Sequence, residues 1–243
     1  MNAIETHDLT KRYRRLTAVD GLNLTVTAGE LFALLGVNGA GKSTTIRMLS
    51  CLTRPDGGDA MVCGHSVVRD AAGIKACIGV SPQETAVAPN LTAAENLALM
   101  CGVHGMDRRT TAEKTAALAA QLGLGEVLHR RAGRLSGGWQ RRLSIAMALV
   151  SDPQVLFLDE PTLGLDVLAR SELWDVIRAL RGRTTIVLTT HYMEEAEALA
   201  DRVGVMKSGQ MIALGTVAEL TAQTGAANLE GAFLALVKGA DAQ

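Results

Sequence analysis

The sequence is poor in aromatic residues and in cysteine. Phe, Trp and Tyr make up 3% of the 243 residues, and the four cysteines (Cys51, Cys63, Cys77 and Cys101) show no CxxC spacing. Without such spacing, neither a metal site nor a disulfide framework is expected. We therefore expect buried, free thiols in a protein of a reducing compartment.

Long hydrophobic runs are also absent. The longest, such as IAMALV at 145–150, are far shorter than the roughly 18–20 apolar residues that span a bilayer. The N-terminal MNAIETHDLTKRY lacks the apolar stretch of a signal peptide. We expect a chain that is soluble by itself, so any role at a membrane requires a partner.

The chain has no large excess of charge of either sign, since its formal net charge is −1. Proteins that bind nucleic acid usually carry a basic field or patch. Nucleic acid is therefore not expected as a partner. The length suffices for one large domain with a buried core.

Apolar runs and turn signals predict strands that alternate with helices. IETHDL, LNLTV and LFALL predict strands in the first 35 residues, and further strands are predicted at 155–159, 184–190, 202–206 and 210–214. Between them, 168–181 and 193–200 have helical patterns. This alternation predicts an α/β fold with a mainly parallel sheet flanked by helices.

The middle of the chain differs from the rest because it is rich in alanine and leucine. Thr92 and Glu95 have capping-box spacing at the start of one predicted helix, and TTAEKTAALAAQLGL predicts a second that ends at Gly123 and Gly125. We predict one domain over 1–243, with a core of 1–83 and 151–243 and an inserted helical subdomain over 84–150.

A glycine-rich loop, GVNGAGKS, lies between a predicted strand and a predicted helix. It fits the pattern GxxxxGK[ST], in which glycines let backbone N–H groups surround phosphate oxygens. Gly36, Gly39 and Gly41 would form this cradle, Lys42 would reach the β- and γ-phosphates, and Ser43 would ligate Mg²⁺. The alternative, a chance glycine turn, is disfavoured by the strand–loop–helix context. The loop predicts a nucleoside triphosphate site.

A buried acidic strand, VLFLDEPT, supplies two carboxylates near the same edge. Asp159 ends the strand, where ligands collect in open α/β sheets, and is a candidate partner of Mg²⁺, either directly or through a ligand. Glu160 follows with a different direction and could polarise an attacking water. Its alternative role is a solvated charge at the end of a strand.

A second glycine-rich loop, LSGGW, runs directly into a helical pattern but carries no lysine. Ser136, Gly137 and Gly138 would offer hydroxyl and N–H donors at a helix N-terminus. Because the first loop already occupies one side of a triphosphate, this one could reach a γ-phosphate only from the opposite side.

GVNGAGKS, LSGGW, VLFLDEPT, LGLD and TTHYMEEAEALADRV, in this order and spacing, resemble the ATP-binding subunit of an ABC transporter. The resemblance implies a P-loop NTPase fold with an N-terminal antiparallel β region, and ATP and Mg²⁺ as ligands. It further implies two copies with two ATP molecules between them, favouring a homodimer. A membrane permease subunit would dock near 84–106 and hold the chain at the cytoplasmic side of the cell membrane.

The same resemblance assigns roles to individual residues. Tyr13 would stack on adenine, although it could instead be an ordinary half-buried strand tyrosine. Gln83 would sense Mg²⁺ and the γ-phosphate and connect to the helical subdomain. His191, at the end of a strand beside Asp159, would contact the γ-phosphate. Asp166, in LGLD, would belong to a loop that crosses to the second subunit. The remaining loop positions expected at the nucleotide are Val37, Asn38, Ala40 and Thr44, the last at the α-phosphate.

The sequence signals for the direction of transport, and those against competing functions, are less specific. The ending NLEGAFLALVKG resembles exporters of drugs, lipids, polysaccharides or sodium ions, so export is favoured over import. An ABC ATPase acting on nucleic acid or ribosomes is disfavoured by the single P-loop and the near-neutral charge. A non-hydrolysing regulator is disfavoured because Glu160 and His191 are both present. Trp139 departs from the glutamine usual in the family, and an indole accepts no hydrogen bond.

Overall fold

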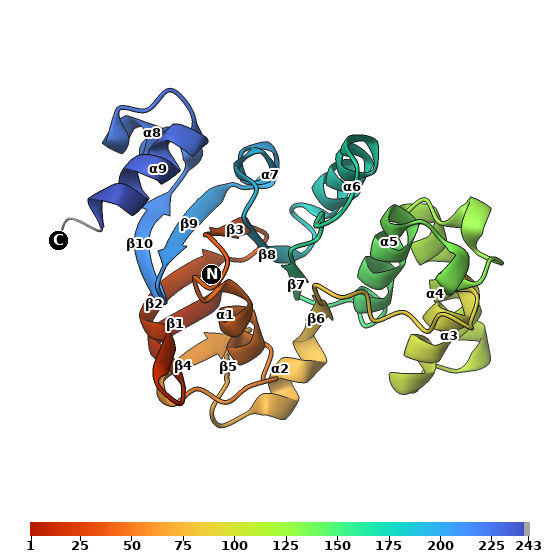
Figure 1. Cartoon of the computed structure of the whole chain (residues 1–243). Helices are drawn as coiled ribbons and strands as arrows, with labels where there is room; N and C mark the ends of the chain where they lie inside the picture. Colours follow the sequence, from red (N-terminus) through yellow and green to blue (C-terminus); the bar gives the residue numbers. More distant parts are fainter. Residues whose placement is uncertain (241–243) are drawn as a thin grey trace.

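The protein is described here by a computed structural model that covers residues 1–240, and it is built around two β-sheets (Figure 1). The larger sheet has six strands in the order β10-β9-β3-β8-β7-β6. Its central strands are parallel, and β10 pairs antiparallel with β9 at one edge. The strands are β3 (Leu31–Leu35), β6 (Ile78–Ser81), β7 (Val155–Asp159), β8 (Thr185–Thr190), β9 (Arg202–Lys207) and β10 (Gln210–Gly215). The predicted α/β fold with a mainly parallel sheet is confirmed.

The smaller sheet is antiparallel and is formed mostly by the N-terminal region. Its order is β2-β1-β4-β5, with β1 (Asn2–Tyr13), β2 (Leu16–Thr27), β4 (Gly57–Val62) and β5 (His65–Ser66). The predicted alternation of Leu22, Leu24 and Val26 is present, since all three are buried between exposed neighbours. The strands expected at 4–9 and 22–26 are too short, because the pairing of β1 with β2 continues to the turn at Arg14.

Two hydrophobic cores lie on opposite faces of the larger sheet. Alternate residues of β3 separate them: Leu31, Ala33 and Leu35 pack on one side, and Phe32 and Leu34 on the other. This follows from the period of two along a strand. The face that carries Phe32 and Leu34 is covered by the smaller sheet together with α1 (Lys42–Leu49) and α2 (Ala71–Cys77). The other face is covered by helices that include α6 (Val167–Leu180), α7 (Met193–Leu199), α8 (Val217–Thr224) and α9 (Leu229–Gly239).

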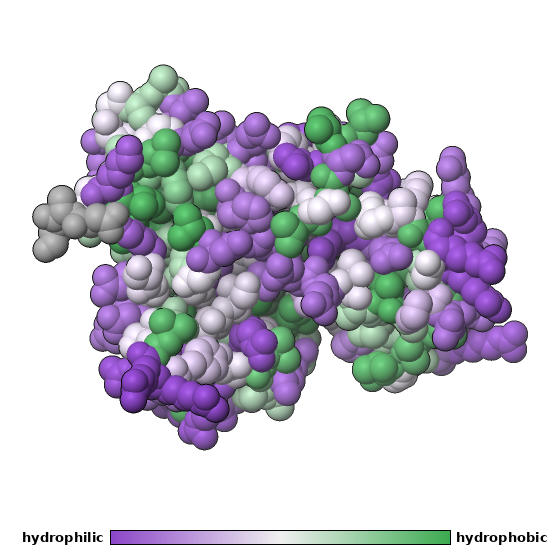
Figure 2. Space-filling view, viewed as in Figure 1, coloured by the Kyte–Doolittle hydropathy of each residue, from purple (hydrophilic) through white to green (hydrophobic). Residues whose placement is uncertain are grey.

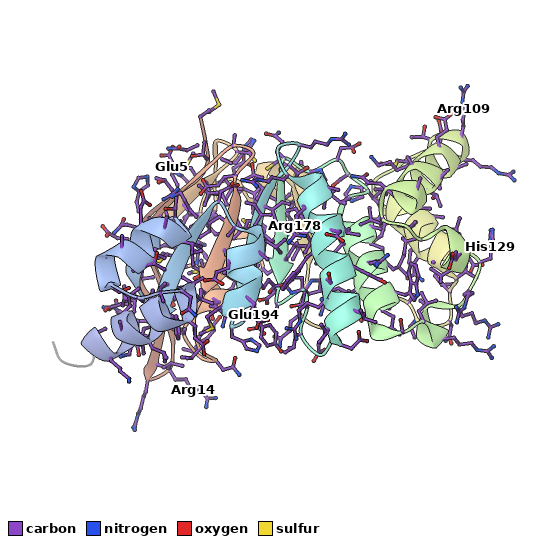
Figure 3. The ribbon with its side chains drawn as sticks, turned by 90° about the horizontal axis from the view of Figure 1, so that it is seen from above. Glu5, Arg14, Arg109, His129, Arg178 and Glu194 are labelled. Carbon is purple, nitrogen blue, oxygen red and sulfur yellow. The ribbon has the colours of Figure 1, made fainter. Side chains whose placement is uncertain are left out.

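A helical part is inserted between β6 and β7 and lies beside the sheets at the right of Figure 1. It contains α3 (Ala93–Val103), α4 (Arg108–Gln121) and α5 (Gly137–Ala148), with short 3₁₀ turns at Gly125–Val127 and Ala132–Arg134. The capping box predicted from Thr92 and Glu95 is confirmed at the start of α3. Arg109 and His129 mark the outer end of this part in Figure 3, far from Arg14 at the β1–β2 turn.

The surface in Figure 2 is mostly polar, with a hollow that sets the helical part apart from the sheets. Within residues 1–240, no helix combines the length and apolarity needed to cross a membrane.

The four cysteines are free, but only Cys77 and Cys101 are buried, so the expectation of four buried thiols is wrong for Cys51 and Cys63. Both of these follow the end of an element, where the chain turns towards the surface.

Candidate functional site

A pocket of about 440 Å³ opens where the central parallel strands end. Such a volume suits a small-molecule ligand. The lining comes from segments far apart in the sequence: strands β1 and β2 of the smaller sheet, the glycine-rich loop, the segment after β6, and the ends of β7 and β8. The residues are Tyr13, Leu16, Ala18, Asn38, Gly39, Ala40, Gly41, Lys42, Ser43, Thr44, Gln83, Glu160, Leu163 and His191. Most of the residues predicted from separate motifs are therefore brought together.

The glycine-rich loop joins β3 to α1 and forms one wall of this pocket. Gly41 has φ = +106°, and a Cβ on it would lie 2.4 Å from the carbonyl oxygen of Ala18. Only glycine fits this conformation and this close approach. The loop passes directly into the N-terminus of α1, whose backbone N–H groups favour an anion. The local geometry therefore matches a phosphate site.

Lys42 is the first residue of α1 and lies on the floor of the pocket with 5% of its surface exposed. Its Nζ donates to the carbonyl oxygens of Gly36 (2.8 Å) and Val37 (3.3 Å). Gly36 and Val37 thus support the lysine, although neither lines the pocket. The ammonium group also lies 3.4 Å from Oε1 of Glu160. It is held where phosphate oxygens could replace these partners.

Asp159 and Ser43 lie side by side although 116 residues separate them. The Ser43 hydroxyl donates to Oδ1 of Asp159 at 3.0 Å, and the Thr189 hydroxyl donates to the same oxygen at 2.5 Å. A hydroxyl and a carboxylate beside a phosphate loop are hard oxygen donors, which Mg²⁺ prefers. The residues present therefore fit a magnesium ion, with Ser43 and Asp159 as the groups to hold it.

Glu160 is buried between two positively chargeable groups. Its φ is +47°, which turns the side chain away from the direction of Asp159, and 7% of its surface is exposed. Oε2 lies 2.7 Å from Nδ1 of His191, a close contact without the alignment of a hydrogen bond. Its backbone N–H donates to the Thr189 hydroxyl at 3.0 Å. This burial argues against the alternative of a solvated charge.

Tyr13 and Gln83 border the open side of the pocket. Tyr13 ends β1 with 42% of its surface exposed, and the Lys11 ammonium lies 5.4 Å from the centre of its ring. An exposed aromatic face at a pocket rim offers a stacking surface. Gln83 follows β6 with an exposed side chain, while its carbonyl oxygen is held by Arg141.

The second glycine-rich loop and Asp166 lie outside the pocket. Ser136 is the N-cap of α5, but it is exposed and its side chain makes no capping hydrogen bond. Asp166 caps α6 by accepting from the backbone N–H of Ala169 at 2.9 Å. A Cβ on Gly138 would lie 3.2 Å from Cβ of Ala169, so the two loops are neighbours. One chain therefore does not bring these predicted residues to its own pocket.

Trp139 interacts within its own chain. The indole packs against the hydrophobic core, and the guanidinium of Arg142 lies 4.9 Å from the ring centre. Trp139 and Arg142 line a separate hollow of about 680 Å³. The (i, i+3) spacing from Trp139 to Arg142 in the sequence is the signal that indicates this contact on one helix face.

Two further residues of the site were missed from the sequence. Thr189 is fully buried and joins Asp159 to the backbone of Glu160. Its position near the end of a parallel strand next to β7 could have indicated it. Arg141 is buried on α5 and holds the segment that carries Gln83. No sequence signal distinguishes it from the neighbouring Arg142.

Comparisons with known proteins agree with this geometry. A family model described as ABC transporter matches residues 19–163. The chain is 47% identical over 224 residues to the daunorubicin/doxorubicin resistance ATP-binding protein DrrA of Streptomyces peucetius, covering 92% of this chain and 68% of that protein. It is 44% identical over 221 residues to the Nod factor export ATP-binding protein I of Paraburkholderia xenovorans (strain LB400), covering 90% and 73%. A solved structure of an ATP-binding subunit of an ABC transporter superposes with a TM-score of 0.83 at 28% identity, covering 97% of this chain and 99% of that one.

Proposed function

Since this chain belongs to the ABC transporter family, as an ATP-binding subunit with ATPase activity, we propose that it powers the export of a substrate through a separate membrane-spanning subunit. The observation that carries the proposal is the pocket lined by Lys42, Ser43 and Glu160 at the ends of the parallel strands, with Asp159 hydrogen-bonded to Ser43 behind it. The resistance and export roles of the two relatives support the outward direction.

The pocket is proposed to bind ATP with its phosphates on the glycine-rich loop. Lys42 exchanges its bonds to carbonyl oxygens for bonds to the β- and γ-phosphates, because a charge-assisted bond to phosphate is stronger. The hydroxyl of Thr44 binds at the α-phosphate. Tyr13 stacks on the adenine ring, as its exposed position at the pocket rim supports.

Ser43 and Asp159 are proposed to hold a magnesium ion, and Gln83, which lines the same pocket as Ser43, would contribute to its binding. When bound, Mg²⁺ neutralises charge on the phosphate oxygens. The chain's own residues orient this site: Thr189 fixes the Asp159 carboxylate through a 2.5 Å hydrogen bond.

Glu160 is proposed to accept a proton from the water that attacks the γ-phosphorus, while the bond to the β-phosphate oxygen breaks. His191 contacts the γ-phosphate from the end of β8 and keeps the Glu160 carboxylate in place. When the phosphates bind, they replace Glu160 as the counter-charge of Lys42. The Glu160 carboxylate is then available as a base.

A second copy of the chain is proposed to complete the site. Ser136, Gly137 and Gly138 do not line the pocket, and the Ser136 side chain makes no capping hydrogen bond, so this helix N-terminus suits a γ-phosphate on another molecule. Next to Asp166, Val167 and Leu168 are 77% and 76% exposed, and hydrophobic residues lie at the surface over α6 in Figure 2. Exposed apolar residues beside a polar loop are typical of an interface.

The membrane subunit is proposed to dock on the side of the helical part that includes 84–106. A hollow of about 350 Å³ lies there between α3, α5 and β6 and is lined mainly by apolar atoms. Leu99 and Val103 on α3 are 51% and 71% exposed. This docking would hold the chain at the cytoplasmic side of the membrane.

Two measurements test the proposed function. Lys42→Ala should abolish ATP binding, measured by calorimetry, and ATP turnover. The wild-type chain should co-purify with membranes when a membrane protein encoded next to it is co-expressed, and should remain in the soluble fraction without it. Unchanged turnover in Lys42→Ala, or stimulation of turnover by DNA or RNA, would count against the proposal.

A further inference from the structure

Arg141 makes an unusual pair of contacts for a buried arginine. It is 4% exposed, and its two terminal nitrogens donate to main-chain carbonyls rather than to a carboxylate. One nitrogen donates to the carbonyl oxygen of Pro82 and the other to that of Gln83, each at 2.6 Å. The planar guanidinium therefore spans two consecutive peptide groups of the segment that enters the nucleotide pocket.

Such a contact is costly to maintain. Burying a charge is unfavourable unless it is well hydrogen-bonded, and burial lowers the pKa of the Arg141 guanidinium, partly offset by the charges of Asp159 and Glu195. An apolar residue of similar length would fill the same space without this cost. The guanidinium therefore supplies something other than packing, namely a fixed geometry for two carbonyl groups.

Two neighbours on α5 hold the same segment. The hydroxyls of Ser144 and Ser81 lie 2.9 Å apart, and Oε1 of Gln140 accepts from the Thr85 hydroxyl at 3.5 Å. Positions 140, 141 and 144 share one face of the helix. The segment from Ser81 to Thr85 is therefore attached along α5, and Arg141 makes its shortest bonds.

The helix that carries Arg141 also begins with the second glycine-rich loop. Ser136 caps α5 on the exposed side, outside the pocket, whereas Gln83 lines the pocket. The same helix thus connects the Ser136–Gly138 loop, outside the pocket, to the main chain of Gln83, a residue that lines the pocket. The two bonds from Arg141 to the carbonyls of Pro82 and Gln83 therefore link the main chain at Gln83 to the helix that begins with this loop.

We propose that Arg141 is a positioning residue that fixes Gln83 in the nucleotide pocket relative to the Ser136–Gly138 loop. Contact of that loop with a second copy then places Gln83 for turnover. This role rests on the proposed function, because it requires an ATP site that includes Gln83.

The test is a double-mutant cycle of Arg141→Met and Gln83→Ala on the full chain, with kcat for ATP and the Kd for ATP measured separately. Arg141→Met should lower kcat about tenfold, since each 1.4 kcal/mol is a factor of ten and lost bonds to a charged group are of that order. The Kd should change less than twofold, because the glycine-rich loop is not touched. In the Gln83→Ala background the same substitution should lower kcat less than twofold.

Two further variants separate positioning from folding. Arg141→Lys keeps the charge but cannot bridge two carbonyls as a planar fork does, so its kcat should fall between wild type and Arg141→Met. Arg142→Met is the matched control, since it removes the same group from the next position, where the partners are Glu172 and the Trp139 ring rather than the segment after β6. Its kcat should stay within twofold of wild type.

An equal fold-loss from Arg141→Met in both backgrounds would overturn the positioning role. So would an equal loss in Arg142→Met, or wild-type turnover in Gln83→Ala. These results leave the proposed function intact as long as the wild-type chain hydrolyses ATP. Absence of turnover in the wild-type chain with Mg²⁺ would instead overturn the proposed function and this role together.

Discussion

Replacing Glu160 with glutamine tests the centre of the proposed mechanism. The change keeps the size of the side chain and removes the negative charge that lies 3.4 Å from the Lys42 ammonium and 2.7 Å from Nδ1 of His191. The amide cannot accept the proton of an attacking water. We expect ATP to bind, turnover to fall, and an ATP-bound dimer to accumulate.

The magnitudes follow from the geometry. At 3.4 Å and an effective dielectric constant of about 20, the attraction between Lys42 and Glu160 is about 5 kcal/mol. Removing one partner of a buried ion pair costs about 3–5 kcal/mol of stability. Because Lys42 keeps its two carbonyl partners, we expect a loss near the lower end, about 3 kcal/mol. Loss of a general base lowers kcat about 10²- to 10⁴-fold, or about 3–5 kcal/mol in the barrier.

The assay combines phosphate release, calorimetric binding of ATP and gel filtration with ATP and Mg²⁺. Glu160→Gln should elute as a dimer with ATP and as a monomer without it. The double variant with Lys42→Ala is the control and should remain monomeric, because it lacks the phosphate contact. Turnover of Glu160→Gln within threefold of wild type, or only monomer in the presence of ATP, would refute the reasoning.

Four further substitutions address the glycine-rich loop, the indole of Trp139 and the buried acid Glu195. Gly41→Ala should abolish nucleotide binding in a calorimetric titration, because its Cβ would lie 2.4 Å from the carbonyl oxygen of Ala18. Gly39 has φ = +83° and nothing lies within 4 Å of an added Cβ, so Gly39→Ala should cost only the strain of that conformation, about 1–2 kcal/mol of stability. Equal effects of Gly41→Ala and Gly39→Ala on nucleotide binding would contradict this explanation. Trp139→Gln should keep ATP turnover within about threefold of wild type. Its Tm should fall, because about 1–2 kcal/mol of packing and cation–π contact is lost. A collapse in turnover would reveal another role for the indole. Burial raises the pKa of the Glu195 carboxyl, so the folded state binds this proton more tightly than the unfolded chain does. The folded state therefore loses stability as the pH rises above about 4.3, the pKa of a glutamate in the unfolded chain. Glu195→Gln should therefore raise Tm relative to wild type more at pH 8 than at pH 4, as measured by thermal unfolding, and an equal difference at both values would contradict the assignment.

Much of the fold could be predicted from the sequence because its signals are local. The strand expected at 155–159 is β7 without change, and that expected at 184–190 begins one residue later as β8. The helix at 168–181 is shifted by one residue. These segments are buried runs with strong periodicity. The N-terminal hairpin was underestimated because its outer half is polar, so the pairing of β1 with β2 is what keeps it extended.

The sequence by itself determined which residue types the candidate site contains, because the glycine-rich loop, the acidic strand and the second glycine-rich loop are contiguous motifs. The tertiary structure alone decided how these pieces meet. It buried Glu160 between Lys42 and His191, assigned Thr189 to Asp159, and attached the Gln83 segment to Arg141. It also placed Ser136 outside the pocket. Such contacts join residues that are far apart in the sequence, and only the packing of helices and strands brings them within hydrogen-bonding distance.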